Sequence, residues 1–564
     1  FYLKGQDSSA LGDDSSGNGN DWTTSNLAAN DQMSDSPTNN WCTLSSLDAV
    51  GPTLNNGNLG LDGTSSAAWL TARATMSIPS TGKWYWECIA TSSGNAGDPN
   101  FGIVADTVNT QVADWLQDPL AYAYTTRSDT VINNDYLGTS RGTYNGGNVL
   151  QIAYDADTGK LHFGIQNSWI NGGDPADGSD PDFTTSTTPT FLPYVAIYNN
   201  KTGSINFGQS AFAYTPPTGF LALNSANLPA PAIADPSAYF QTTLYTGDGV
   251  AIGSGGLEVN QSENSTFQPD LVWIKQRESP AASHEVFDAI RGATKDLNTN
   301  TNEAETTFSE KLTSFDADGF TVGNNGNVNT LNKDYVAWQW NEGATSGFDI
   351  VSYTGNATAR TISHSAGVVP KMIIVKNLAD TDNWAVYHAG NTAAPATDYL
   401  VLNENSATAD DATVWNDTAP TSSVFSVGTS SLTNGNTEAM IAYVFAEVEG
   451  FSKFGSYLGN ANANGPMINL GFKPAWVMIK QADTSARDWI IQDATRNPFN
   501  AANLQLLPNA SSAEALTFYS QSAAIDIVSN GFKVRSSTVR VGENGANYIY
   551  AAFAEAPFKT ANAR

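Results

Sequence analysis

The chain has 564 residues, and at about 150 residues per domain this length predicts three to five domains rather than one core. Charged residues make up only 14% of it, and 55 acidic against 26 basic side chains give a net charge of −29. A chain this acidic lacks the clustered cations that bind phosphate, so we expect no nucleic-acid partner. No run approaches the roughly 18 apolar residues of a membrane helix, so we expect no membrane insertion.

The composition favours short strands joined by tight turns. The 48 glycines and the many Asn, Ser, Thr and Asp side chains suit turns, while 14 Trp, 21 Tyr and 25 Phe supply material for cores. We therefore predict an all-β, multidomain chain built as a string of β-sandwich or jelly-roll-like domains. Its two cysteines, Cys42 and Cys88, are too few for a disulfide framework; they form one bridge or, as we expect, two free thiols.

Residues 1–62 are rich in Asn, Ser, Asp and Gly and contain the acidic stretch Asp13–Asp21. An Asx-rich turn is our interpretation of this stretch, because Asp and Asn side chains hydrogen-bond their own backbone. A calcium loop is the alternative, since hard cations take several carboxylate and carbonyl oxygens. The spacing misses the EF-hand pattern, which favours the turn.

Residues 63–235 carry a series of strand signals in a fixed order. Aromatic and alternating runs are bounded by Gly, Asn and Asp, as expected for strands. A tight turn at 155–159 joins two of the runs into a hairpin. The predicted strands are Lys83–Ile89, Asn100–Val104, Ala121–Tyr124, Val149–Tyr154, Lys160–Ile165, Tyr194–Tyr198 and Gly203–Gly208.

This order of motifs resembles the SPRY family over about residues 80–225. The matching marks are the Gly-Lys-Trp-Tyr-Trp-Glu strand from Gly82, the Phe-Gly-Ile-Val strand from Phe101, the hairpin Asp155–Phe163, the Asn-Ser-Trp segment at Asn167 and the Asn-Phe-Gly strand at Asn206. The resemblance implies a bent β-sandwich whose loops bind proteins or other ligands. It implies no catalysis.

Three homologous β domains are predicted to follow, at 238–345, 346–449 and 450–564. Five marks recur in one order about every 100 residues: an aromatic turn, a Pro-led apolar run ending in Lys, a second strand, a Phe-containing strand, and a closing aromatic strand followed by Glu. The Pro-led runs are Pro269–Lys275, Pro370–Lys376 and Pro474–Lys480.

The recurring lysines and glutamates invite a functional interpretation, but a structural one is simpler. A strand-end lysine blunts a sheet edge or extends to solvent, and we interpret Lys275, Lys376 and Lys480 in this way. The glutamates that close the three segments, Glu342 among them, are interpreted as strand ends where the chain leaves for the next domain.

A second resemblance covers essentially the whole chain. The stretch Asp14–Thr23, the segment Asp35–Asn39, the SPRY-like module, the linker Phe212–Phe220 and the tail Ala552–Arg564 are together similar to fibre-type virion proteins of tailed, particularly marine, bacteriophages. In that family a lectin-like sandwich often precedes such an acidic stretch, so residues 1–62 are interpreted as an Asx/Gly-rich segment or the edge of such a domain. The resemblance implies a place on the virion, on tail or capsid, and contact with a host.

The sequence shows no pattern that indicates catalysis. A nucleophile elbow, a zinc-protease helix motif and a phosphate-binding glycine loop are all missing from it. With 55 carboxylates, no glycosidase pair stands out. We therefore expect no enzyme, and the polysaccharide depolymerases that occur on virions are the less favoured alternative.

The long segment from Asn167 to Pro189 is the best binding candidate, because loops on a rigid sandwich are where recognition usually lies. Aromatic faces stack on sugar rings while carboxylates accept hydroxyl hydrogens. The alternative is that the aromatic residues are core and the aspartates solvate a loop; a calcium ion in the same loop is a further one. The candidate ligand-binding residues are Trp115, Tyr122, Tyr124, Trp169, Asp174, Asp177, Asp180 and Asp182.

These observations lead to one functional expectation. The chain is expected to be a tail-fibre adhesin on the virion that binds a host-surface receptor or glycan multivalently, without a cofactor. By resemblance we expect a homotrimer that also contacts other virion proteins. The rival expectation is a capsid-decorating or head-fibre protein, whose loss would lower particle integrity instead of adsorption.

Overall fold

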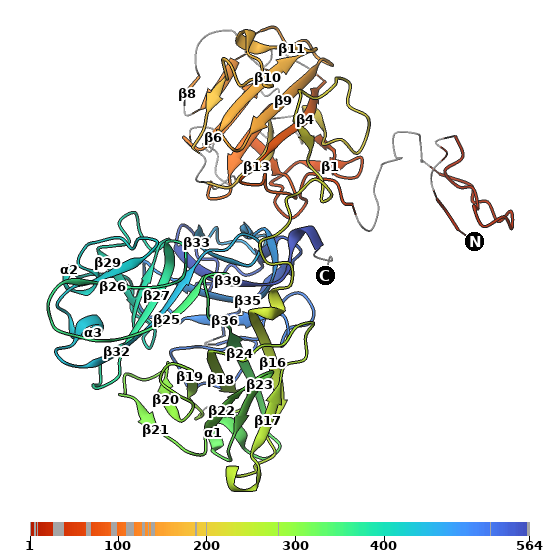
Figure 1. Ribbon diagram of the computed structural model, residues 1–564. Coiled ribbons are helices and arrows are strands. Elements are labelled where there is room, and N and C mark those ends of the chain that lie inside the picture. Colours follow the sequence, from red (N-terminus) through yellow and green to blue (C-terminus); the bar gives the residue numbers. More distant parts are fainter. Residues whose placement is uncertain are drawn as a thin grey trace. The chain divides into compact units, whose positions relative to one another are not determined.

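A computed structural model of the chain is shown in Figure 1. It divides into two compact units, unit 1 (Phe1–Pro229) and unit 2 (Ala230–Arg564). None of the helices in the described residues is long and apolar enough to cross a membrane. The structure describes residues 2–4, 7, 9–25, 39–63, 69–91, 99–108, 118–126, 130–133, 135–136, 142–186, 189–198, 200–279, 281–518 and 520–560.

Unit 1 contains two sheets that pack as a sandwich (Figure 1) and are antiparallel except where one short strand lies parallel to its neighbour. In its described part, the larger sheet has the order β1 (Thr53–Asn55), β2 (Gly60–Asp62), β14 (Thr202–Asn206), β4 (Lys83–Ala90), β9 (Val149–Asp155), β10 (Lys160–Ile165) and β11 (Ser168–Trp169), with β12 (Phe183–Thr184) beside β10 and β15 (Leu221–Ala222) beside β4. The other has the order β3 (Trp69–Arg73), β13 (Phe191–Tyr198), β5 (Asn100–Ala105), β6 (Ala121–Thr125), β7 (Thr130–Asn133) and β8 (Asp135–Tyr136).

Strand β4 shows why the larger sheet of unit 1 is buried on both faces. Alternate residues of a strand point to opposite faces, and Trp84 and Trp86 alternate with Tyr85 and Glu87, yet all four side chains are buried. The Glu87 carboxylate accepts the backbone N–H groups of residues 213 and 214 at 2.8 and 2.9 Å. The segment after β14 therefore covers the outer face of this sheet and is held there by hydrogen bonds.

Unit 2 repeats one strand order in three modules: module 1 (240–340), module 2 (348–446) and module 3 (452–557). In each main sheet, counted along the chain, the first strand pairs with the last, the last with the second, and the second with the third. The main sheet of module 1 has the order β16 (Phe240–Thr246), β24 (Asp334–Trp340), β18 (Leu271–Gln276), β19 (His284–Asp288), β20 (Lys295–Asn298) and β21 (Thr306–Thr307). That of module 2 has the order β25 (Phe348–Thr354), β32 (Ala439–Ala446), β27 (Pro370–Asn377), β28 (Ala385–His388), β29 (Asp398–Val401) and β30 (Ala409–Asp410). That of module 3 has the order β33 (Ser452–Leu458), β39 (Asn547–Pro557), β35 (Phe472–Gln481) and β36 (Ile490–Asp493).

A small sheet or hairpin accompanies the main sheet of each module. Its strands are β17 (Leu257–Asn260), β23 (Gly319–Val322) and β22 (Leu312–Asp316) in module 1, β26 (Arg360–Ser363) and β31 (Val424–Val427) in module 2, and β34 (Met467–Asn469), β38 (Gly531–Val534) and β37 (Ile525–Val528) in module 3. Short helices complete the described part of the chain: α1 (Gly326–Asn329), α2 (Ala412–Trp415), α3 (Ser431–Asn434) and the 3-10 helices η3 (Ile170–Gly172), η4 (Pro236–Ala238), η5 (Ile252–Ser254) and η6 (Phe558–Thr560).

The main sheets of modules 1 and 2 are each buried on two sides. In β18, Val272 and Ile274 join a core beneath the small sheet of module 1, whereas Leu271 and Trp273 join a core common to all three modules. Strand β27 of module 2 divides in the same way. Burial on both faces explains why these strands are continuous apolar runs rather than alternating ones.

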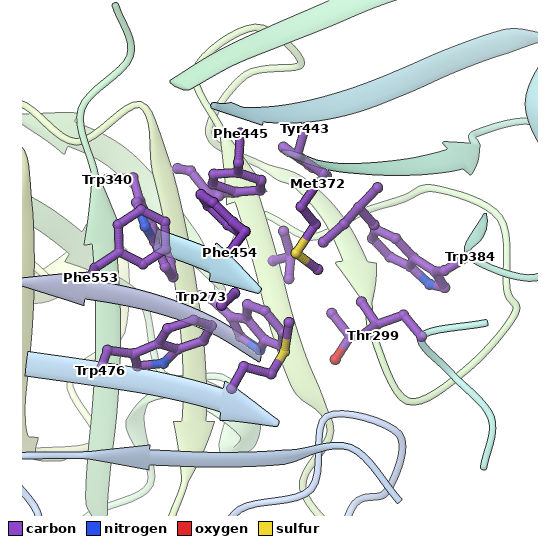
Figure 2. Close-up of a pocket in the computed structure, with 16 residues that line it drawn as sticks. Trp273, Thr299, Trp340, Met372, Trp384, Tyr443, Phe445, Phe454, Trp476 and Phe553 are labelled. Atoms are coloured by element: carbon purple, nitrogen blue, oxygen red, sulfur yellow. The ribbon is translucent and has the colours of Figure 1, made fainter. Parts of the chain in front are cut away.

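The common core centres on three aromatic rings, one from the last strand of each module. Trp340 of β24, Phe445 of β32 and Phe553 of β39 lie in pairwise contact, with ring centroids 5.7 to 6.4 Å apart. Figure 2 shows these rings around a cavity of about 30 Å³, together with Trp273, Trp384 and Trp476. Its lining is almost entirely apolar, and the hydroxyl of Thr299 in that lining already donates to the carbonyl of Pro508. Because a buried water needs several polar partners, we interpret the cavity as a packing defect of the core rather than a ligand site.

Polar contacts close the three modules into a ring. The indole N–H of Trp384 in module 2 donates to the carbonyl of Asn298 in module 1 at 3.1 Å, and that of Trp489 in module 3 donates to Val401 in module 2 at 2.9 Å. The Thr299 hydroxyl of module 1 donates to the carbonyl of Pro508 in module 3 at 2.8 Å. Each module is therefore fastened to both of the others.

The lysines that end the Pro-led strands are buried, which corrects the interpretation that they extend to solvent. Lys275, Lys376 and Lys480 are all 0% exposed. The Lys275 Nζ donates to the carbonyl of Gln276 at 2.7 Å, and the Lys376 Nζ to those of Asn377 at 2.6 Å and Asp380 at 3.1 Å. Burial lowers the pKa of each lysine to about 8. Their role is to pair the backbone carbonyls of the turn that follows each strand.

Two features of unit 1 also bear on the sequence analysis. Cys42 and Cys88 are both free and buried. The Asp14 carboxylate accepts the backbone N–H groups of Tyr2, Ser16 and Asn20, and hydrogen bonds from Ser16 and Tyr2 lower its pKa. These contacts are those of an Asx-rich turn.

Candidate functional site

The candidate site is the loop of residues 166–182 between β10 and β12, called here the β10–β12 loop. It starts as a hairpin in which Gly164 faces Trp169 and Ile165 faces Ser168. The connecting residues, Gln166 and Asn167, have φ of +49° and +64°. Two positive φ values are typical of a type I′ turn, whose twist matches that of the strands. The turn thus fixes the direction in which Trp169 leaves the sheet.

Trp169 is half-buried against the outer face of the larger sheet. A Cβ added to Gly164 would lie 2.9 Å from Cε3 of this indole, so the ring depends on a glycine beneath it. The indole also packs beside the buried cluster of Tyr85, Ala153 and Phe220. One part of the ring is therefore held by the sheet while the rest faces solvent.

The aspartates beyond Trp169 shape the loop through its backbone. Asp174 accepts the N–H of Ala176 and Asp177 accepts the N–H of Ser179, both at 2.8 Å. Hydrogen bonds from Ser179 lower the pKa of Asp177, so its carboxylate is ionised at neutral pH. Asp174, Asp177 and Asp180 are all exposed. They form a patch of negative charge with a defined backbone.

Side chains from β10 hold the base of this loop. The buried His162 Nε2 lies 3.0 Å from the carbonyl of Ser179, and the Lys160 Nζ donates to the carbonyl of Gly178 at 2.8 Å. Asp182 accepts the N–H of Phe163 at 2.8 Å. Burial lowers the pKa of His162, so the imidazole is neutral at neutral pH. The sequence analysis missed Lys160 and His162; their signal is the alternation of polar with apolar residues along β10.

The two predicted tyrosines do not belong to this surface, and their placement corrects the prediction. The Tyr122 ring contacts Phe183 and Phe191 at centroid distances of 5.2 and 5.9 Å, and Tyr124 is fully buried beside Phe163. Both fill the sandwich core because β6 points these alternate residues inward. Trp115 lies outside the described residues.

The site offers binding groups rather than an arrangement of reactive ones. The structure places Trp169, Asp174, Asp177 and Asp180 in one loop with their side chains at least partly exposed, while the Asp182 carboxylate is turned to the backbone of β10. Across the described residues, no group of three or more His, Cys, Asp or Glu side chains is placed to hold a metal ion. An aromatic face beside carboxylates suits a ligand with both apolar and hydroxyl-bearing surfaces.

The fold defines a multidomain β protein, with a two-sheet sandwich in unit 1. The chain belongs to the family described as Domain of unknown function (DUF7483), whose sequence model matches residues 235–557, more than half of the chain. The match spans all three modules of unit 2, as expected for segments that share one core. No curated protein matches the chain.

Similar solved structures are SPRY domains. The SPRY domain of human HERC1 is 15% identical with a TM-score of 0.24, and the match covers 29% of this chain and 96% of that one. The TRIM65 PSpry domain is 14% identical with a TM-score of 0.23, covering 29% and 91%, and a human SPRY domain is 13% identical with a TM-score of 0.23, covering 29% and 98%. At these TM-scores the likeness carries no argument about function.

Proposed function

We propose that this protein is a non-enzymatic fibre protein of a phage virion, a tail-fibre adhesin that binds a host-surface receptor or glycan through the β10–β12 loop. The observation that carries the proposal is a partly exposed Trp169 in the same loop as three exposed aspartates, a loop that is hydrogen-bonded to a rigid sandwich. Such a loop is ordered before it binds, which lowers the entropic cost of binding.

The chemistry of the loop favours a sugar-bearing receptor. The apolar face of a sugar ring stacks on an indole, while ionised carboxylates accept its hydroxyl hydrogens. Each contact of this kind is weak, and many copies held on one particle raise the overall avidity. We propose a homotrimer on the virion surface, and solution mass, which distinguishes a monomer from a trimer, tests that part directly.

Adsorption of phage particles to host cells tests the proposal. Trp169→Ala, and separately the triple change Asp174→Asn, Asp177→Asn and Asp180→Asn, are introduced into the full chain on the particle. We expect at least a tenfold loss of adsorption with normal particle yield. Trp22→Ala is the matched control, because Trp22 is an exposed tryptophan outside the loop.

Two results would contradict the adhesin. Adsorption that Trp169→Ala leaves unchanged would exclude the loop as the receptor site. Release of reducing sugar ends from host glycans by the purified chain would show a depolymerase instead of a non-enzymatic fibre.

The alternative proposal is a capsid-decorating or head-fibre protein, favoured by one observation in unit 2. Its three modules share a single core and are joined by polar contacts at every junction, which suits a rigid building element. Electron microscopy of intact particles distinguishes the two roles by the position of the chain. Fragile particles on deletion of the chain, with adsorption per intact particle unchanged, would favour the decorating role.

A further inference from the structure

Module 3 contains a second pocket, separate from the aromatic core. It has a volume of about 190 Å³, more than ten times the roughly 10–15 Å³ that one water needs. Three segments line it: the turn between β35 and β36, the segment between β36 and β37, and the connection between β38 and β39. Its lining residues are Ala486, Arg487, Asp488, Gln521, Val539 and Arg540.

Two guanidinium groups are fixed at this pocket. The side chain of Arg540 is 5% exposed; its Nη1 donates to Asp488 Oδ2 at 2.8 Å and its guanidinium lies 5.7 Å from the ring centroid of Phe518. The Arg487 Nε donates to Gln481 at 2.8 Å, and its Nη2 pairs with the Glu543 carboxylate at 3.4 Å. Because Ala486 is exposed and Arg540 buried, the pocket runs from the surface inward to a cation.

The corresponding positions of modules 1 and 2 show that the fold does not need these arginines. Tyr335, Met440 and Tyr548 each pair with the tyrosine of the first strand of their module, which aligns the three closing strands. Eight residues before them stand Asn327, Leu432 and Arg540.

The second arginine gives the same result. Lys275 pairs with His284, and extending the pairing of β27 with β28 and of β35 with β36 by one residue places Lys376 opposite Trp384 and Lys480 opposite Trp489. Two residues before these three stand Ala282, Asp382 and Arg487. The same strand order is thus built twice without a basic pair at this place, so a requirement of the fold does not explain it.

The chemistry of the pocket selects a ligand class. Guanidinium groups form charge-assisted, often bidentate hydrogen bonds with carboxylates, and each carries five N–H donors in a fixed geometry. Asp488 and Gln521 offer acceptors and an amide donor of the kind that pairs with hydroxyl groups.

We propose that this pocket binds a carboxylated sugar, a uronic acid. Arg487 and Arg540 face its carboxylate, and Asp488 and Gln521 pair with its hydroxyls. The site lies in unit 2 and shares no residue with the β10–β12 loop. A failure of the uronic-acid proposal would therefore leave the adhesin proposal unaffected, and the reverse also holds.

Calorimetric titration of the full chain with D-glucuronate tests the site, with D-glucose and acetate as comparison ligands. We expect glucuronate to bind at least tenfold more tightly than either, and Arg487→Gln and Gln521→Ala each to weaken it at least tenfold. Arg535→Gln is the matched control, because Arg535 is a partly exposed arginine of module 3 paired with Asp526 outside the pocket. Thermal unfolding of each variant verifies that the fold is kept.

Three outcomes would overturn the inference. Glucuronate that binds no better than glucose excludes a carboxylate site. Acetate that binds as tightly as glucuronate excludes recognition of the sugar. An affinity that falls equally in Arg487→Gln and Arg535→Gln places binding outside the pocket.

Discussion

The two units bury their strands in different ways. Unit 1 encloses a core between two sheets and covers the outer face of the larger sheet with its own downstream segment. Unit 2 turns one face of each of three main sheets toward a common centre, where Trp340, Phe445 and Phe553 meet. Unit 1 therefore encloses its core without the loop of residues 166–182, which lies at its surface. The modules of unit 2, in contrast, depend on one another for their cores.

The largest expected effect is at the common core. Trp340→Ala removes a buried indole that contacts both other modules, and truncations of this kind cost about 3–5 kcal/mol. Because the core is shared, we expect amide hydrogen exchange to rise in all three modules and not in unit 1. Trp86→Ala, in the core of unit 1, is the control and should show the reverse. Faster exchange confined to module 1 would show that the modules are independent.

The next largest effect concerns the junction between modules 1 and 3. Glu514 accepts Arg277 Nη2 and Arg496 Nη1, each at 2.8 Å. Burial alone would raise the pKa of Glu514. The hydrogen bonds and charges of the two arginines lower it by more, so the pKa of Glu514 lies below its usual value. Glu514→Gln removes the anion that pairs with the partly buried Arg277 and weakens two charge-assisted hydrogen bonds, while Arg496 keeps its pair with Asp493; we expect a cost of about 3 kcal/mol in urea unfolding.

Glu555→Gln is the control for this change. Its exposed pair with Lys473 is worth less than about 1 kcal/mol. Equal losses in the two variants would contradict the view that the junction between modules 1 and 3 closes the ring.

The junction between modules 2 and 3 predicts a pH dependence. His388 is buried, its Nδ1 accepts the N–H of Gly390, and its Nε2 lies 3.0 Å from the carbonyl of Tyr550. Burial lowers its pKa to about 4. Between pH 6.5 and 4 the unfolded chain binds a proton that the folded chain does not, so stability falls as the pH falls. We expect His388 to contribute a loss of about 2 kcal/mol between pH 7 and pH 5.

Urea unfolding at pH 7 and pH 5 measures this loss, and His388→Asn separates it from the titration of carboxylates. The variant should lose less stability over the interval than the original chain. The same loss in both proteins would exclude His388 as its source.

The smallest effect on stability is expected in unit 1. Gly164→Ala places a methyl group 2.9 Å from the Trp169 ring, which must move, at a cost of about 1 kcal/mol to unit 1 alone. Adsorption should fall far more than stability does, if Trp169 contacts the receptor. Gly253→Ala, where an added Cβ meets open space, should change neither. Unchanged adsorption in Gly164→Ala would contradict the role of the loop.

Strand positions could be predicted because they depend on local pattern. The predicted strand Lys160–Ile165 coincides with β10, and the predicted strands Lys83–Ile89 and Val149–Tyr154 each end one residue before β4 and β9. Apolar runs bounded by Gly, Asn and Pro identify such strands without any knowledge of their neighbours. The all-β class followed from the same pattern.

The shared core and the buried lysines could not be predicted in the same way. An apolar run such as β27 does not reveal which of its two faces meets another module. The sequence around Lys376 is equally compatible with an exposed lysine side chain. Its burial depends on a turn that brings two carbonyls to the Nζ atom. At the candidate site, Trp169 and the aspartates were found from loop composition, whereas Tyr122 was misplaced because composition does not tell core from surface.

The ring of unit 2 has a consequence for the order of its segments. The modules contact one another pairwise, and Pro231 and Pro557 both lie near Gly450, so the two ends of the ring are close in space. A circularly permuted chain, with the old ends joined and a new start at residue 346, preserves every contact around the aromatic centre. The order of the modules along the sequence is then one of three orders that give the same ring of contacts.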